Sequence, residues 1–208
     1  PSSGLSATTG SNVIANPAGT TTYSIVGTSS GGCSDTAFVT VTSNSVPVIT
    51  ASAGTAVCVG STISLTASGA VNYTWLPSSG LSATTGANVN ANPTTTTTYT
   101  IIGSSAGCND TTSVIITVNT LPVITASPGV TICNGNNTVL TAGGTINYFW
   151  TPSSGLNTTT GNSVTADPTI ITTYTVIGVD ANGCLDTTSV SRYSKTFPKK
   201  RLLKNLIL

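Results

Sequence analysis

The chain has 208 residues, of which 38% are hydrophobic and only 5% are charged, whereas ordinary soluble domains carry about 25% charged residues. It has no histidine, methionine or glutamate, and all six lysines and arginines lie in residues 192–208. Residues 1–191 therefore hold five aspartates and no cation, which excludes neutralisation of a phosphate backbone and with it nucleic-acid binding. No apolar run is long enough for a membrane-inserted helix.

The chain is built from tandem repeats. The pentapeptide PSSGL begins at Pro1, Pro77 and Pro152, and the sequence around it returns almost position by position. This self-similarity predicts four segments. They are the C-terminal part of a truncated repeat (1–46), a complete repeat (47–121), a nearly complete repeat (122–191) and an atypical basic tail (192–208).

Within the complete repeat, apolar residues alternate with Thr, Ser and Asn in short runs. In chain order these runs are TISLTA (62–67), NYTW (72–75), TTYTIIG (97–103) and TTSVIITV (111–118). A period of two predicts strands with one buried and one exposed face. No run has the 3.6-residue period of a helix. Short strands separated by Gly, Pro and Asn favour an all-β fold of β-sandwiches.

PSSGL directly follows the strand that carries a tryptophan. Pro77 fixes its own φ, Ser78 and Ser79 can bond to nearby backbone, and Gly80 can adopt a positive φ. We therefore expect a structured crossover between the two sheets. A ligand-binding loop is the alternative interpretation.

The chain has five cysteines, and each full repeat holds two of them. The favoured interpretation pairs Cys58 with Cys108 and Cys133 with Cys184 inside the repeats, and it leaves Cys33 unpaired by truncation. Pairing between neighbouring repeats is the alternative, because distances cannot be judged from sequence. Either pairing implies an oxidising, extracellular compartment.

Four sequence pieces recur in a fixed order, which in the third repeat are ICNG, YFWTPSSGL, TTYTVIG and NGCLDT. As a set they resemble the immunoglobulin-like and PKD-like repeats of very large surface proteins in Bacteroidetes, among them adhesins linked to gliding motility and exported by the type nine secretion system. The resemblance covers almost all of residues 1–191. It implies tandem immunoglobulin-like β-sandwich repeats of about 75 residues, a cell-surface or secreted location, and no catalytic residues.

We therefore expect a non-catalytic structural or adhesive stalk. Its expected partners are neighbouring repeats of the same chain and, beyond them, surface glycans or other cells. Residues 1–191 lack His, Lys and Glu, so acid–base catalysis has few possible groups, and neither an enzyme nor a cofactor is expected. Without histidine or a CxxC pair, no metal site is predicted. The alternative function is a carbohydrate-binding accessory module of a secreted polysaccharide-degrading enzyme.

The aromatic residues allow two interpretations. Alternation places Tyr73 with Trp75, and Tyr148 with Trp150, on one face of a strand. One aromatic face per sandwich is typical of a core, and a platform for stacking sugars is the alternative. The expected core aromatics are Trp75, Trp150, Tyr99 and Tyr174.

An Asp–Thr pair recurs at one position of every repeat. Asp35, Asp110 and Asp186 can hydrogen-bond to local backbone in a hairpin. A second interpretation is calcium at the repeat junctions, which would need six to eight oxygen ligands. The third is modification, because DTA and DTT resemble an O-glycosylation motif of Bacteroidetes. That resemblance implies sugars on Thr36, Thr111 and Thr187.

The basic tail departs from the repeat pattern. It is expected either to bind an acidic surface or anionic lipid, or to arise from a frameshift or the end of a gene fragment. For one permitted set of codons, dropping the first base of the Arg192 codon gives Val-Thr-Val-Lys-Pro-Phe, close to the expected repeat. On the frameshift hypothesis the third repeat lacks a proper last strand, and the nucleotide sequence decides the question.

Overall fold

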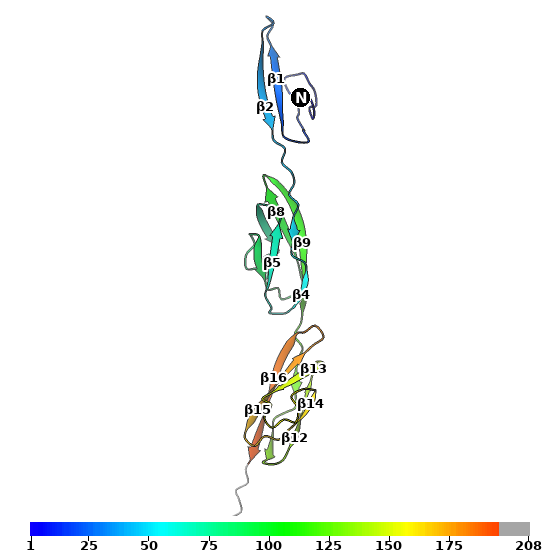
Figure 1. The fold of residues 1–208 in the computed structure, drawn as a ribbon, viewed down its shortest axis with the longest axis vertical. Coiled ribbons are helices and arrows are strands. Elements are labelled where there is room, and N and C mark those ends of the chain that lie inside the picture. Colours follow the sequence, from blue (N-terminus) through cyan, green and yellow to red (C-terminus); the bar gives the residue numbers. More distant parts are fainter. Residues whose placement is uncertain (196–208) are drawn as a thin grey trace, which may run out of the picture. The chain divides into compact units, whose positions relative to one another are not determined.

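The computed structural model describes the backbone of residues 1–195 and the side chains through residue 192, and all regular structure in this part is β-strand (Figure 1). Within these residues no helix is long and apolar enough to cross a membrane. The runs of β-branched and aromatic residues that predicted strands do form strands. The first repeat contributes only two, β1 (Thr21–Thr28) and β2 (Ser34–Val41).

The second repeat is a pair of sheets. Strands β3, β5 and β7 form one sheet in that order, and the other has the order β4-β9-β8-β6. Strand β4 lies parallel to the end of β9, whereas β6 is antiparallel to β8. The strands are β3 (Thr50–Ala51), β4 (Thr55–Cys58), β5 (Ile63–Ser68), β6 (Asn72–Leu76), β7 (Asn88–Ala91), β8 (Thr97–Ser105) and β9 (Cys108–Asn119).

The third repeat reproduces this topology. Its sheets have the orders β10-β12-β14 and β11-β16-β15-β13, again with one parallel pair, β11 and β16. The strands are β10 (Thr125–Ala126), β11 (Val130–Cys133), β12 (Thr138–Gly143), β13 (Asn147–Thr151), β14 (Ser163–Ala166), β15 (Thr172–Val179) and β16 (Leu185–Lys195).

The two sheets of each full repeat pack as an immunoglobulin-like sandwich around one core. Strand β13 shows the alternation: Tyr148 and Trp150 are buried, while Phe149 between them is 48% exposed. Side chains from both sheets fill the core, as expected for a sandwich. In the third repeat the core consists of Ile124, Leu140, Tyr148, Trp150, Val164, Ala166, Tyr174, Val176 and Val190.

The first repeat has the hairpin β1–β2 but lacks counterparts of β3 to β6. Ile25 is 56% exposed, whereas its equivalent in the second repeat, Ile101, is fully buried. Val39 is 45% exposed and its equivalent Val114 only 3%. These apolar side chains therefore lack the opposing sheet that covers them elsewhere. Tyr23 is nevertheless buried, because the loop that contains PSSGL packs over it.

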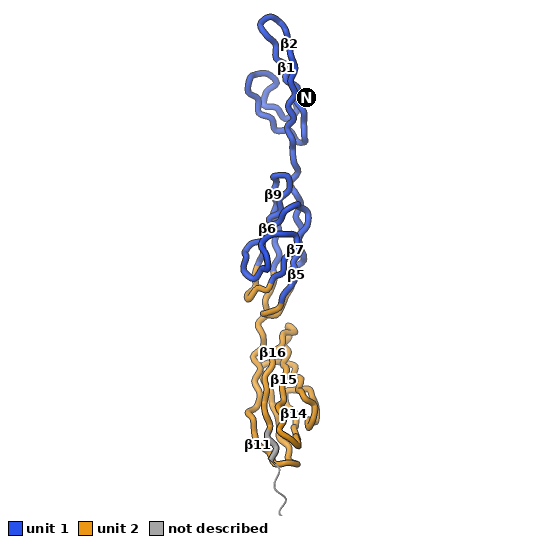
Figure 2. The backbone as a smooth tube through the Cα atoms, turned by 90° about the vertical axis from the view of Figure 1, so that its left-hand side faces the viewer, with its two compact units in different colours: residues 1–54, 62–91, 98–115 blue, residues 55–61, 92–97, 116–208 orange. Residues whose placement is uncertain are grey.

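By its contacts the chain forms two compact units (Figure 2). One comprises residues 1–54, 62–91 and 98–115, and the other comprises residues 55–61, 92–97 and the chain from Ile116 onward. The division falls inside the repeat predicted at 47–121. As a result, β4 and the end of β9 group with the third repeat.

The last strand crosses the predicted boundary at residue 191. Strand β16 runs to Lys195 and pairs with β11 from Val130↔Arg192 to Cys133↔Lys195. The expectation of a missing last strand in the third repeat is therefore wrong, because the ladder uses backbone groups that every residue except proline supplies. The rest of the basic tail, with its predicted binding to acidic surfaces or lipid, lies outside the described residues.

Candidate functional site

A disulfide joins two successive repeats. Cys58, the last residue of β4, is bonded to Cys184, which directly precedes β16, and their Cα atoms are 5.6 Å apart. The two residues are 126 positions apart in the chain. We call this bond the junction disulfide. The expected pairing within repeats is therefore wrong, and Cys108 and Cys133 carry free thiols, as does Cys33.

The strand register explains why pairing within a repeat fails. Cys58 lies beside Asn119, the last residue of β9, while Cys108 is the first residue of the same strand. A twelve-residue strand spans roughly 36 Å, and a disulfide needs Cα atoms within about 7 Å. The two cysteines of one repeat therefore lie at opposite ends of its sheet. The same holds for Cys133 and Cys184 in the third repeat.

The junction disulfide has one charged neighbour, because the Asp180 carboxylate accepts a hydrogen bond from the backbone N–H of Cys184 at 2.9 Å. Cys184 is fully buried. A hollow of about 400 Å³ lies beside the bond, and among the described residues no ionisable or aromatic side chain lines it. The site joins two segments covalently, and the carboxylate beside it is engaged by the backbone of Cys184. The lining residues are Cys58, Val59, Gly60, Ser61, Leu121, Gly183 and Leu185.

PSSGL anchors a buried tyrosine. The Tyr99 hydroxyl donates to the backbone oxygen of Ser79, and Tyr174 donates in the same way to Ser154, both at 2.8 Å. The first repeat has the same bond, from Tyr23 to Ser3. Burial raises the pKa of the Tyr174 phenol above its usual value, and the negative charge of Asp167 adds to the rise, against a hydrogen bond with Thr172 that lowers it.

The glycine of PSSGL brings two backbones together. Gly155 has a φ of +73°, and a Cβ at this position would lie 2.9 Å from the backbone oxygen of Asp167. Only glycine tolerates this combination of conformation and close approach. The pentapeptide thus recurs because it connects the sheets and closes over the core tyrosine.

The two tryptophans lie in the cores. Trp75 is fully buried and Trp150 is 3% exposed. Each indole Nε1–H donates to a backbone oxygen, that of Gly86 at 2.8 Å and that of Gly161 at 2.9 Å. The neighbouring tyrosines on the same face are also buried. The hypothesis of a sugar-stacking platform on these residues is therefore wrong, since their faces are covered by the opposite sheet.

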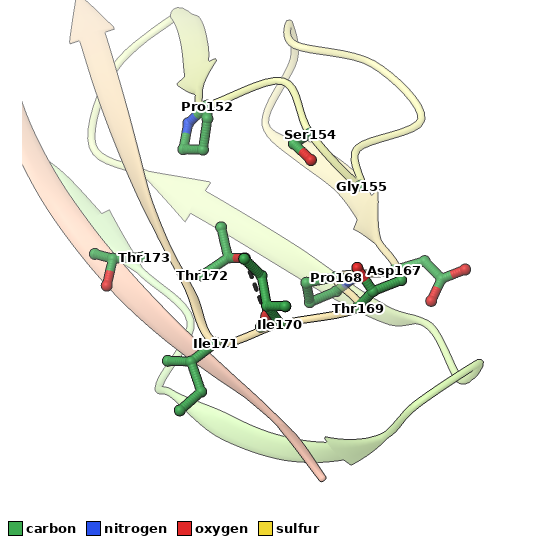
Figure 3. Close-up of a pocket in the computed structure, with 10 residues that line it drawn as sticks. All are labelled: Pro152, Ser154, Gly155, Asp167, Pro168, Thr169, Ile170, Ile171, Thr172 and Thr173. Carbon is green, nitrogen blue, oxygen red and sulfur yellow. Dashed lines mark hydrogen bonds between the residues drawn. The ribbon is translucent and has the colours of Figure 1, made fainter. Parts of the chain in front are cut away.

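A second hollow, of about 520 Å³, lies beside the PSSGL loop of the third repeat (Figure 3). Loop residues form one wall, and the connection between β14 and β15 forms the other. Of the residues that the structure describes, Asp167 is the only ionisable one in its lining, so this lining holds neither a carboxylate pair nor a nucleophile with a base. Its hydroxyl and backbone groups allow hydrogen bonding only. The lining residues are Pro152, Ser154, Gly155, Asp167, Pro168, Thr169, Ile170, Ile171, Thr172 and Thr173.

The recurring aspartates bond to backbone. Asp35 and Asp186 each accept a hydrogen bond from the following residue, the N–H of Thr36 and of Thr187, at 2.8 Å. Asp110 accepts a longer one, 3.4 Å, from the N–H of Ile49. In the part of the chain that the structure describes, no three His, Cys, Asp or Glu side chains gather as metal ligands would.

The threonines of the Asp–Thr pairs are accessible. Thr36, Thr111 and Thr187 are all exposed on the second strand of their hairpins. Their exposure is compatible with modification.

No family model matches the sequence, and no curated protein matches it. Among solved structures, the chain is similar to the I-band fragment I67–I69 of titin, with 16% identity over 74% of this chain and 67% of that one and a TM-score of 0.40. It is similar to the N-terminal eight Ig domains of Down Syndrome Cell Adhesion Molecule, with 14% identity, 88% and 29% coverage and a TM-score of 0.43. It is also similar to Sidekick-1 immunoglobulin domains 1–5, with 16% identity, 89% and 48% coverage and a TM-score of 0.37.

Proposed function

We propose that the chain is a non-catalytic mechanical segment, a stalk, of a secreted or cell-surface bacterial protein. The observation that carries this proposal is the position of the junction disulfide. Strands β5 through β15 all lie between Cys58 and Cys184. One covalent bond therefore bridges nearly all the strands of two sandwiches.

The bridge changes what a pulling force can do. When the chain is pulled from its two ends, the tension passes through the disulfide and bypasses the residues between the two cysteines. At about 3.3–3.6 Å per extended residue, the bypassed segment corresponds to roughly 430 Å of chain. The segment can therefore transmit force with little extension, which is what a spacer between a cell surface and an adhesive part requires.

The chemistry of the chain supports the same proposal. The described residues that line the two hollows include no paired ionisable groups of the kind that catalysis uses. A disulfide persists in oxidising compartments, which supports an extracellular location. The junction disulfide bonds one repeat to the next, so neighbouring repeats are the first partners that we propose. Surface glycans or other cells are the partners that we propose for the adhesive function that the stalk supports.

Single-molecule stretching of the full chain tests the mechanical role. The chain is attached at its two ends and extended with and without a reductant. Without the reductant we expect residues 59–183 to stay inaccessible to extension. With it, the final contour length should increase by roughly 430 Å.

The variant Cys58→Ser should show the long contour length without a reductant. Cys33→Ser removes a free thiol instead and is the control that should behave as the parent chain does. Full extension of the untreated parent chain would refute the proposed role.

We also propose that Thr36, Thr111 and Thr187 carry O-linked sugars in the native organism. Sugars on a nearly uncharged chain would add solubility. The intact mass of the protein purified from its natural source should exceed the sequence mass by whole hexose units. A protein in which all three are changed to valine should lose that excess, and an unmodified native mass would end the proposal.

A further inference from the structure

In both full repeats an early strand pairs with the end of the last strand in one register. Cys58 lies opposite Asn119, and Cys133 lies opposite Lys195, the equivalent position of the third repeat. Directly after Cys58, the N–H of Val59 donates to the backbone oxygen of Asn119 at 2.9 Å. The early cysteine of a repeat is therefore placed by the backbone of its last strand.

In the first repeat the early strand is absent, and β2 ends at Val41, so that the next three residues are not in a strand. Strand β2 has β1 as its one neighbour in a two-stranded sheet. The residues equivalent to 116–119 are 41–44, and we call them the acceptor edge. Asn44 is the counterpart of Asn119.

A free thiol lies at this edge. The Cys108 Sγ is 3.7 Å from the backbone oxygen of Asn44, and the Asn44 side chain in turn donates to the oxygen of Ala106 at 2.8 Å. Cys108 is the counterpart of Cys184, the cysteine that closes the junction disulfide. The thiol therefore occupies, one repeat earlier, the place from which Cys184 reaches Cys58.

We propose that the acceptor edge and Cys108 form a covalent docking site for an extended strand that carries a cysteine, of the kind seen in residues 55–59. The strand adds parallel to residues 41–44. The residue after its cysteine donates its N–H to the Asn44 oxygen, and its cysteine forms a disulfide with Cys108. The proposal stands whether or not the chain is a stalk, since it rests on strand register and on the bond formed one repeat later.

The chemistry is a thiol–disulfide exchange. The Cys108 thiolate attacks the strand's sulfur in a mixed disulfide, the new S–S bond forms, and the other thiolate leaves with the electron pair. No further oxidant is needed, because the mixed disulfide is reduced in the same step. Outside the test tube, the strand's cysteine would first exchange with a small-molecule disulfide, which gives the mixed disulfide that Cys108 attacks.

The test uses a synthetic peptide of sequence GTAVCVGST, residues 54–62, with its cysteine activated as an aryl mixed disulfide. The peptide is mixed with the full chain, and the products are cut by a protease that cleaves before aspartate. The fragments 1–34, 35–109 and 110–166 separate the free thiols Cys33, Cys108 and Cys133, while Cys58, also in 35–109, stays linked to fragment 180–185 by the junction disulfide. A peptide on 35–109 that is still linked to 180–185 is therefore bonded to Cys108. We expect the peptide on fragment 35–109 first, although Cys33 is the exposed thiol.

The matched control peptide has proline after its cysteine, which removes the N–H that would bond to Asn44. It should react with Cys108 about tenfold more slowly, as expected for one lost backbone hydrogen bond and its ladder neighbours. Its reaction with Cys33 should be unchanged. The proposal would be overturned if the exposed Cys33 reacted before Cys108, or if the two peptides reacted with Cys108 at equal rates.

Discussion

Tyr99 donates its hydroxyl hydrogen to the backbone oxygen of Ser79, twenty residues earlier, and Tyr174 bonds to Ser154 across the same interval. Both phenol rings are fully buried. The bond therefore fixes the PSSGL loop over the core at one point in each repeat. Removing the hydroxyl group while keeping the ring therefore measures how much this bond to the loop contributes to stability.

Tyr174→Phe should destabilise the third repeat by about 1 kcal/mol, because it removes one hydrogen bond and keeps the packing of the ring. The measurement is urea unfolding followed by Trp150 emission in a Trp75→Phe background, so that the signal reports on the third repeat alone. Tyr99→Phe in the same background is the control and should leave the Trp150 transition unchanged. An unchanged midpoint for Tyr174→Phe would show that the hydroxyl contributes nothing.

The same tyrosine predicts a pH dependence. Burial raises the pKa of Tyr174 in the folded state, so the unfolded chain loses its phenol proton first, near pH 10. Its contribution to stability is fully present below that pH and is lost as the pH rises through the folded pKa. The free energy of unfolding of the third repeat should therefore fall less steeply above about pH 10 in Tyr174→Phe than in the parent. Parallel curves would contradict this.

The strands and cores follow from local sequence, and the disulfide does not. Alternation around Trp75 and Trp150 identifies the buried face, because side-chain direction along a strand is set by residue number alone. The partner of Cys58 depends instead on how β4 registers against the far end of β9 and on which residue of the next repeat reaches that end. Both are long-range relationships that no short pattern encodes. The equal number of cysteines in each full repeat favoured the wrong pairing for that reason.

Arg192 is a second case that the pattern could not resolve. Its charge places it in the basic tail by sequence, yet it is 1% exposed at the position that Ile116 fills in the second repeat. Its guanidinium donates to the oxygens of Pro128, Ser127 and Val139. Because β16 pairs with β11 through backbone groups, the strand continues beyond residue 191, where the basic tail begins. The Arg192 side chain is buried as a consequence.

Arg192→Ile should stabilise the third repeat. None of the guanidinium's acceptors given above is a carboxylate, and its Nε has no hydrogen-bond partner among the described residues. Replacing such a buried charge with an apolar side chain of the repeat's own type should raise the free energy of unfolding by about 1–4 kcal/mol. Urea unfolding followed by Trp150 emission measures it. A loss of stability would show that the bonds to Pro128 and Ser127 outweigh the cost of burying the charge.

Gly69→Ala should strongly destabilise the second repeat. Gly69 has a φ of +101°, and a Cβ there would lie 1.8 Å from the backbone oxygen of Val48. Gly60 also has a positive φ, +87°, but a Cβ there meets nothing within 4 Å. Gly60→Ala should therefore lower the free energy of unfolding by about 1–2 kcal/mol, the cost of holding an alanine at positive φ. Gly69→Ala should lower it by about 1–3 kcal/mol more, because the backbone must also shift to make room for the Cβ. Trp75 emission in a Trp150→Phe background measures both, and equal costs would contradict the close approach.

The junction disulfide can be mapped on the full chain because the aspartates separate its cysteines. The protein should show three free thiols after denaturation without a reductant, whereas pairing within repeats would leave only Cys33. Cleavage before aspartate releases the short fragment 180–185, which contains Cys184. We expect this fragment to be linked to 35–109, which contains Cys58, and to be released by a reductant. Linkage to 110–166 would mean a bond between Cys133 and Cys184, and the bypass of β5 through β15 on which the stalk depends would not exist.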